Sequence, residues 1–101
     1  MYKKVFEAGR VLRSVPLTLR YCIVEEDLSR LGFIIRKKVG NAPMRNSIRR
    51  TLRCSFQAAA PLLKDNTWMI FDVSQKASQC RRSELRAEAD RLLGLLAGRP
   101  T

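Results

Sequence analysis

Four arginines recur at helical spacing near the middle of the chain, and guanidinium groups in such a row can bind phosphates. They are Arg45, Arg49, Arg50 and Arg53. At about 100° per residue, a helix places all four within about 140° of arc, together with Asn46. Between Arg36 and Lys64 there is no Asp or Glu, so nothing nearby in the sequence neutralises the charge. A polyanion such as RNA or DNA would supply the missing negative charge.

A simpler interpretation of this charged stretch is a solvated helix face. Such faces usually mix charges of opposite sign in i,i+4 pairs. Here Arg45, Arg49 and Arg53 repeat at that spacing with like charge, which destabilises a free helix slightly. We therefore favour nucleic-acid binding. Binding to an acidic protein or a membrane surface is the third alternative, but it needs a larger apolar face than this helix keeps after packing.

The composition indicates the same class of partner. The 101 residues include 20 Lys or Arg and 9 Asp or Glu, for a net charge of +11, and such an imbalance points to nucleic acid. Hydrophobic residues make up 46% of the chain, so we expect one modest core and a single nucleic-acid-binding domain over residues 1–101. No segment approaches the roughly 20 apolar residues of a spanning helix, and no secretory signal is visible, so no membrane partner is expected.

Residues that usually catalyse hydrolysis or bind metal are missing or scattered. The chain has no His, and its few carboxylates lie mostly in turn-like segments, so we expect no catalytic residue, no metal site and no cofactor bound by the protein alone. Cys22, Cys54 and Cys80 form no C-x-x-C pair, which argues against a zinc site. Their wide spacing suits a reducing compartment, and a cytoplasmic location is expected.

The segment 36–57 predicts the helix that would hold the arginines in line. Gly40 and Asn41 mark a turn after a strand, Asn41 is a candidate N-cap, and Pro43 falls in the first turn, where a missing N–H costs little. Apolar residues form an arc beside the arginines, which predicts that this face is buried. The arc comprises Met44, Ile48, Leu52, Ser55, Phe56 and Ala59. Pro61 should end the helix.

Other elements are expected on both sides of this helix, which together make an α+β fold. Residues 2–8 predict a short helix ended by Gly9. Alternating or continuous apolar residues predict strands at 17–24, 31–38 and 67–73. In the first of these strands, Leu17, Leu19, Tyr21 and Ile23 should share one face.

The pairing of the strands and the last helix complete the predicted fold. If the first two strands form a hairpin, Thr18, Arg20 and Arg36 can share one sheet face. Residues 74–97 predict a helix with Ser83 as its N-cap and Glu84 in its first turn. Its apolar stripe is Leu85, Ala89, Leu92, Leu93 and Leu96, and Gly98, Arg99 and Pro100 should end it.

The segment 37–53 also carries a family resemblance. Its sequence, K-K-V-G-N-A-P-M-R-N-S-I-R-R-T-L-R, resembles the signature of the bacterial ribonuclease P protein family. The matching residues are Lys37, Lys38, Val39, Gly40, Asn41, Ala42, Arg45, Asn46, Arg49, Arg50 and Arg53. Ser47 departs from the pattern, which usually has Arg there. Residues 2–9, Y-K-K-V-F-E-A-G, are similar to the family's F-x-x-V-(F/Y)-x-x-G.

The resemblance implies a protein subunit of ribonuclease P, the endonuclease that matures tRNA 5′ ends. In that family the RNA subunit performs the hydrolysis with magnesium, so the implied partners are this catalytic RNA and precursor tRNA, and DNA is not expected. It further implies a mixed sheet of about four strands, with the basic helix in a left-handed crossover and helices at both ends. The residues implied to bind the catalytic RNA are Lys37, Lys38, Asn41, Arg45, Asn46, Arg49, Arg50 and Arg53. Those implied to line a cleft for the 5′ leader are Tyr2, Phe6, Thr18, Arg20, Ile34 and Arg36.

Several alternatives stay open from the sequence. Tyr2, Val5 and Phe6 are spaced at i, i+3 and i+4, which suits core packing as well as a cleft that stacks on unpaired bases. A small ribosomal or ribosome-associated RNA-binding protein without a processing role would share the size and the charge.

Four positions depart from the family pattern near the implied cleft. The family often has an aromatic residue where Arg20 stands, and small hydroxyl residues where Ile34 and Arg36 stand. It usually has Arg at the position of Val73. We therefore expect more charge and less base stacking in this cleft than the family pattern implies.

Overall fold

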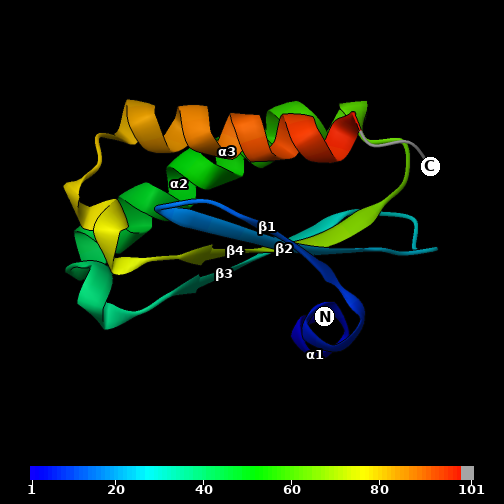
Figure 1. Ribbon diagram of the computed structural model, residues 1–101, viewed down its shortest axis with the longest axis horizontal. Helices are drawn as coiled ribbons and strands as arrows, with labels where there is room; N and C mark the ends of the chain where they lie inside the picture. Colours follow the sequence, from blue (N-terminus) through cyan, green and yellow to red (C-terminus); the bar gives the residue numbers. More distant parts are fainter. Residues whose placement is uncertain (99–101) are drawn as a thin grey trace.

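The computed structural model describes residues 1–98 and shows a four-stranded mixed sheet with helices on both faces (Figure 1). The strands are β1 (Arg10–Arg13), β2 (Leu17–Ile23), β3 (Arg30–Ile35) and β4 (Thr67–Val73). The helices are α1 (Tyr2–Ala8), α2 (Ala42–Ala59) and α3 (Arg82–Ala97), with short 3-10 turns at η1 (Lys37–Val39), η2 (Ala60–Leu62) and η3 (Gln75–Gln79). In Figure 1, α1 lies on one side of the sheet, and α2 and α3 lie on the other. The predicted α+β class, with about four strands and a helix at each end, is confirmed.

The order of the strands differs from the predicted hairpin. β4 lies between β2 and β3, so the order is β1-β2-β4-β3 and the predicted hairpin of β2 with β3 is wrong. The reason lies in β4, where Met69, Ile70 and Phe71 are consecutive and fully buried, because a strand that is buried on both faces takes a central position. β3 runs parallel to β4, and α2 connects them. The left-handed sense of this crossover stays a prediction.

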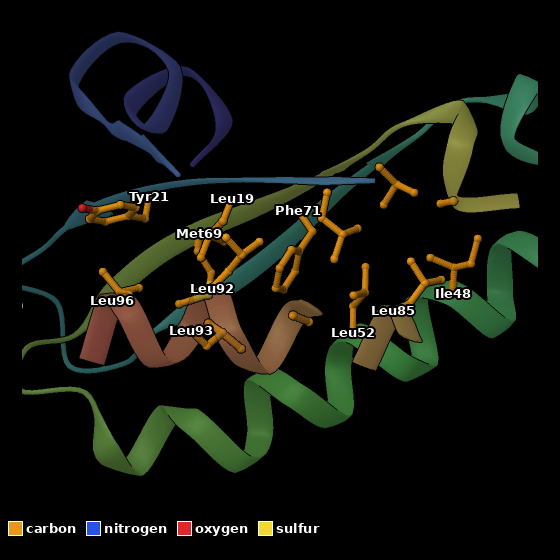
Figure 2. Close-up of a cluster of buried hydrophobic side chains, with 14 of the residues drawn as sticks. Leu19, Tyr21, Ile48, Leu52, Met69, Phe71, Leu85, Leu92, Leu93 and Leu96 are labelled. Atoms are coloured by element: carbon orange, nitrogen blue, oxygen red, sulfur yellow. The ribbon is translucent and has the colours of Figure 1, made fainter. Parts of the chain in front are cut away.

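The main core lies between the sheet and the pair of helices α2 and α3 (Figure 2). Leu17, Leu19 and Tyr21 of β2 point into it, as their alternation predicts, whereas Ile23 at the strand end is 60% exposed, contrary to the prediction. The helices contribute Ile48, Leu52, Ser55, Leu85, Ala89, Leu92, Leu93 and Leu96. This burial fixes one face of α2 against the sheet and leaves the arginines on the other side.

Local signals set the start and end of α2 as predicted. The Asn41 side chain caps the helix by accepting a hydrogen bond from the Met44 N–H at 2.9 Å, and Pro43 stands in the first turn. The helix ends at Ala59, just before Pro61 in η2. The strand before it ends earlier than predicted, because β3 stops at Ile35 and the chain then turns through η1.

Two predictions about the tail are wrong. Residues 74–97 are not one helix, because η3 precedes α3. Ser83 lies inside the first turn of α3, and Arg81 holds the N-cap position, where its backbone N–H donates to Glu84 Oε1 at 3.1 Å. Gly98 follows the last turn. The other two residues predicted to end this helix, Arg99 and Pro100, lie outside the described residues.

The sequence pattern does not predict β1. It is four residues long and has an arginine at each end, so it lacks the apolar run or the long alternation that indicates a strand. β1 pairs antiparallel with β2, from Arg10 opposite Tyr21 to Arg13 opposite Thr18. The strand conformation of β1 is therefore set by its pairing with β2 rather than by its own composition.

The docking of α1 shows which of its apolar residues pack in the core, while their role in a cleft for the leader stays a prediction. Val5 is buried against the sheet, while Tyr2 and Phe6 are 42% and 46% exposed. The Tyr2 hydroxyl accepts a hydrogen bond from the Phe33 N–H at 2.9 Å and donates one to the Phe33 carbonyl oxygen at 3.1 Å. Gly32 leaves room for this contact, since a Cβ there would lie 2.5 Å from the Tyr2 hydroxyl oxygen. The rings of Tyr2 and Phe6 therefore lie at the surface, whereas Val5 of the same helix packs in the core.

Candidate RNA interface

α2 carries its basic residues on the side that faces away from the core. We call Arg45, Asn46, Arg49, Arg50 and Arg53 the α2 stripe. Arg50 and Arg53 are exposed, and Arg45 and Arg49 are half-buried. Asn46 Oδ1 accepts a hydrogen bond from Arg49 Nη1 at 2.8 Å. Within residues 1–98, none of the four arginines forms an ion pair.

Two arginines of the α2 stripe have distinct surroundings. The Arg53 guanidinium lies over the Phe33 ring, 5.6 Å from its centroid, within cation–π range. The Nε atom of Arg45 is shielded from solvent and has no acceptor among residues 1–98.

The other residues predicted to bind the catalytic RNA lie just before α2. Lys37 and Lys38 are exposed in η1, not in a strand as predicted, and they extend the α2 stripe past the start of the helix. The side chain of Asn41 is occupied by the helix cap. Its contact with RNA stays a prediction, as do those of the two lysines.

A second group of predicted residues gathers on the sheet face that carries α1. Arg36 Nη1 lies 3.2 Å from Asp72 Oδ1, and Arg20 Nε lies 3.9 Å from Asp72 Oδ2. The Arg20 guanidinium also lies over the Phe6 ring, 4.9 Å from its centroid. We call this group the sheet-face cluster: Phe6, Thr18, Arg20, Ile34, Arg36 and Asp72.

Asp72 is the centre of this cluster, and the motifs in the sequence do not point to it. Thr18 of β2 and Ile34 of β3 are its cross-strand neighbours. The signal that could have found it is a single acidic residue within the apolar run of β4. Two arginines and one aspartate give the sheet-face cluster one net positive charge, so an anion can still bind there. Val73, where the family usually has Arg, is buried in the main core and offers no such contact.

The α2 stripe and the sheet-face cluster lie on either side of the edge strand β3. Phe33 shows this arrangement, because its ring lies under Arg53 of α2 while its backbone is bonded to Tyr2 of α1. Residues 36–38 follow β3 and lead from the cluster to the start of α2. The two predicted surfaces therefore adjoin at one edge of the sheet.

The remaining polar groups do not form a further site of this kind. Within the described part of the chain, no three His, Cys, Asp or Glu residues are grouped so that they could hold a metal ion. No helix in residues 1–98 is long and apolar enough to cross a membrane. On α3, hydrogen bonds from Arg91 and then from Ser14 lower the pKa of Glu88.

The sequence is similar to known proteins over nearly its whole length. The family model named Ribonuclease P matches residues 1–97. The ribonuclease P protein component of Dehalococcoides mccartyi is 36% identical over 100 residues, which cover 92% of this chain and 76% of that protein. The protein of the same name from Chloroflexus aggregans is 31% identical over 93 residues, covering 91% of this chain and 69% of that protein.

Solved structures share the fold. The RNase P protein of Staphylococcus aureus matches with a TM-score of 0.85 at 23% identity, covering 93% of this chain and 86% of that one. The RNase P protein of Thermotoga maritima matches with a TM-score of 0.79 at 22% identity, covering 99% of this chain and 92% of that one.

Proposed function

The chain belongs to the Ribonuclease P family and is a protein component of that tRNA-processing endoribonuclease, and we propose that it binds two RNAs there, each on its own surface. The α2 stripe, extended by Lys37 and Lys38, binds phosphates of the catalytic RNA. The sheet-face cluster, with Tyr2 beside it, holds the single-stranded 5′ leader of precursor tRNA. The competing role as a ribosomal protein without a processing function is not favoured by the family to which the chain belongs.

The observation that carries this proposal is the unpaired charge of the α2 stripe. Its four arginines form no ion pair within residues 1–98. Phosphate oxygens can supply the missing negative charge, and they accept hydrogen bonds from the guanidinium fork. A folded RNA presents many such oxygens at spacings that a row of arginines can follow.

The sheet-face cluster suits an unpaired strand for a different reason. Phe6 is exposed enough to stack on a base, and Arg36 can reach a phosphate beside it. Asp72 accepts a hydrogen bond from Arg36 and forms a looser ion pair with Arg20, which keeps the net charge of the cluster low. We therefore propose that this surface takes a short single-stranded segment, whereas the α2 stripe takes the structured RNA.

We assign the hydrolysis to the RNA subunit, with magnesium bound to that RNA. The chain has no His, and Asp72, the carboxylate of the sheet-face cluster, forms ion pairs with two arginines, so the two proposed RNA surfaces offer no acid–base pair for hydrolysis. We propose that the protein acts in the cytoplasm.

Purified protein should not cut precursor tRNA by itself, because it lacks a general acid and base suited to the reaction. The test compares cleavage by the protein alone, by the cognate RNA subunit alone and by both together, in magnesium, with protein freed of host nucleases. Cutting at the mature 5′ end by the protein alone would contradict the assignment of catalysis to the RNA.

Binding to the RNA subunit should weaken steeply with salt. Each phosphate contact releases counterions and contributes a slope of about −0.9 on a duplex or about −0.7 on a single strand in a plot of log affinity against log salt. The α2 stripe with Lys37 and Lys38 should make about five contacts, for a total slope of roughly −3.5 to −4.5. A flat plot from filter-binding titrations would rule out an electrostatic interface.

A further inference from the structure

Arg82, the first residue of α3, reaches across to α2. Its Nε donates a hydrogen bond to the Oγ of Ser47 at 2.8 Å. Ser47 directly follows Asn46 of the α2 stripe, and Arg50 comes less than one helical turn later. The contact therefore brings a guanidinium group from another helix to the flank of the α2 stripe.

The other two arginines of α3 show what is unusual about Arg82. Arg86 and Arg91 each form an ion pair with an acid three or four residues away on the same helix. Arg82 has no acidic partner within residues 1–98. Glu84, the nearest acid in the sequence, already accepts a hydrogen bond from the backbone at the start of α3. The charge of Arg82 is therefore as unpaired as those of the α2 stripe.

Arg82 is half-buried, and its bond to Ser47 engages only part of the guanidinium. It uses Nε alone, and the N–H groups on Nη1 and Nη2 of Arg82 have no acceptor in the described residues. A guanidinium that is already held by one bond loses less freedom when it binds a phosphate. The N-terminal end of α3, where Arg82 lies, adds partial positive charge in the same place.

We propose that Arg82 belongs to the surface that binds the catalytic RNA and that Ser47 positions its guanidinium to receive a phosphate between α2 and α3. This inference rests on the proposed function of the α2 stripe, and it widens that surface from one helix to two. Ser47 then acts as a positioning residue, because its hydroxyl accepts the hydrogen bond that orients Arg82.

The test measures binding of the full chain to the transcribed cognate RNA subunit over a range of salt concentrations. Arg82→Ala should weaken the affinity about tenfold and reduce the salt slope by about 0.7 to 0.9. Arg82→Gln keeps a donor for Ser47 but no charge, so it should bind RNA as weakly as Arg82→Ala while it retains more of the thermal stability. Arg86→Ala is the matched control, since it removes a cation from the same helix that is already paired with an acid.

Each outcome decides a separate point. If Arg82→Ala and Arg82→Gln bind like the unchanged protein while replacement of Arg49 and Arg50 weakens binding, the inference is wrong and the proposed function stands. Equal weakening by Arg86→Ala would also overturn it, because general loss of charge on α3 would then suffice. If none of these variants weakens binding, the proposed function itself fails. Normal affinity of Arg82→Gln alone would show that the link to Ser47 acts through helix packing, which also contradicts the inference.

Discussion

Replacing Arg49 and Arg50 with alanine should weaken binding to the RNA subunit about 100-fold. A hydrogen bond to a charged group is worth about 1.5–3 kcal/mol, so two contacts at the lower end give about 3 kcal/mol, or about two factors of ten. The salt slope should fall by about 1.4 to 1.8 at the same time. Folding should survive, because neither side chain belongs to the core and alanine is a strong helix former.

The structure makes this pair a better choice than the other two arginines of the α2 stripe. Arg53 lies over the Phe33 ring, and Arg45 is half-buried with its Nε shielded, so removing either one could disturb packing as well as charge. Within residues 1–98, Arg50 has no hydrogen bond or ion pair that would be lost, and Arg49 loses only its bond to Asn46.

The matched control for this double variant is Arg10→Ala with Arg13→Ala. It removes the same charge from β1, at the sheet edge opposite β3, where both arginines are exposed. Circular dichroism melting of both variants shows whether they fold. An equal loss of affinity in the two variants would mean that net charge alone attracts the RNA, and the α2 stripe would then have no special role.

Local patterns explain why much of the α2 stripe could be predicted from the sequence. The cap at Asn41, the proline that follows it and the apolar arc from Ile48 to Leu52 all act within one or two helical turns. Such signals depend on neighbours in the chain, so the sequence contains them in full. The alternation in β2 predicted the buried face of Leu17, Leu19 and Tyr21 for the same reason, but not the exposure of Ile23 at the strand end.

Contacts between distant segments explain what could not be predicted. The position of β4 between β2 and β3 brings Asp72 between Arg20 and Arg36. The apolar run of β4 suits a central strand, but no local pattern encodes which two strands pair with it. The contact of Arg82 with a residue of α2 is likewise fixed only when the two helices pack together. The prediction of Ser83 as the N-cap of α3 is wrong, because serine is a frequent N-cap but here Arg81, two residues earlier, holds that position.

Replacing Phe6 and Arg36 with alanine should remove the preference for a long leader. The variant deletes the exposed ring and reduces the sheet-face cluster to one arginine and one aspartate, with no net charge. Stacking on an aromatic ring is worth about 1–3 kcal/mol per base, so the advantage of a leader of several nucleotides over one nucleotide should fall roughly tenfold or more. Tyr2 is left intact, because its hydroxyl holds α1 to the edge of β3.

The measurement uses the assembled holoenzyme and compares its affinity for two precursor tRNAs that differ only in leader length. Leu95→Ala with Arg91→Ala is the matched control, because it also removes a half-exposed apolar side chain and an ion-paired arginine, but from α3. That control should leave the leader preference unchanged. Neither variant should weaken binding to the RNA subunit.

This experiment tests whether the two surfaces bind separate RNAs, because the surfaces adjoin at β3. Residues 36–38 run from the sheet-face cluster to the start of α2, and Phe33 contacts residues of both α1 and α2. If the variant of Phe6 and Arg36 weakened binding to the RNA subunit as much as that of Arg49 and Arg50 does, one continuous basic surface would be the better description. A retained leader preference in a folded variant would show that the leader binds elsewhere. Loss of the preference with intact binding to the RNA subunit is the result that two separate surfaces require.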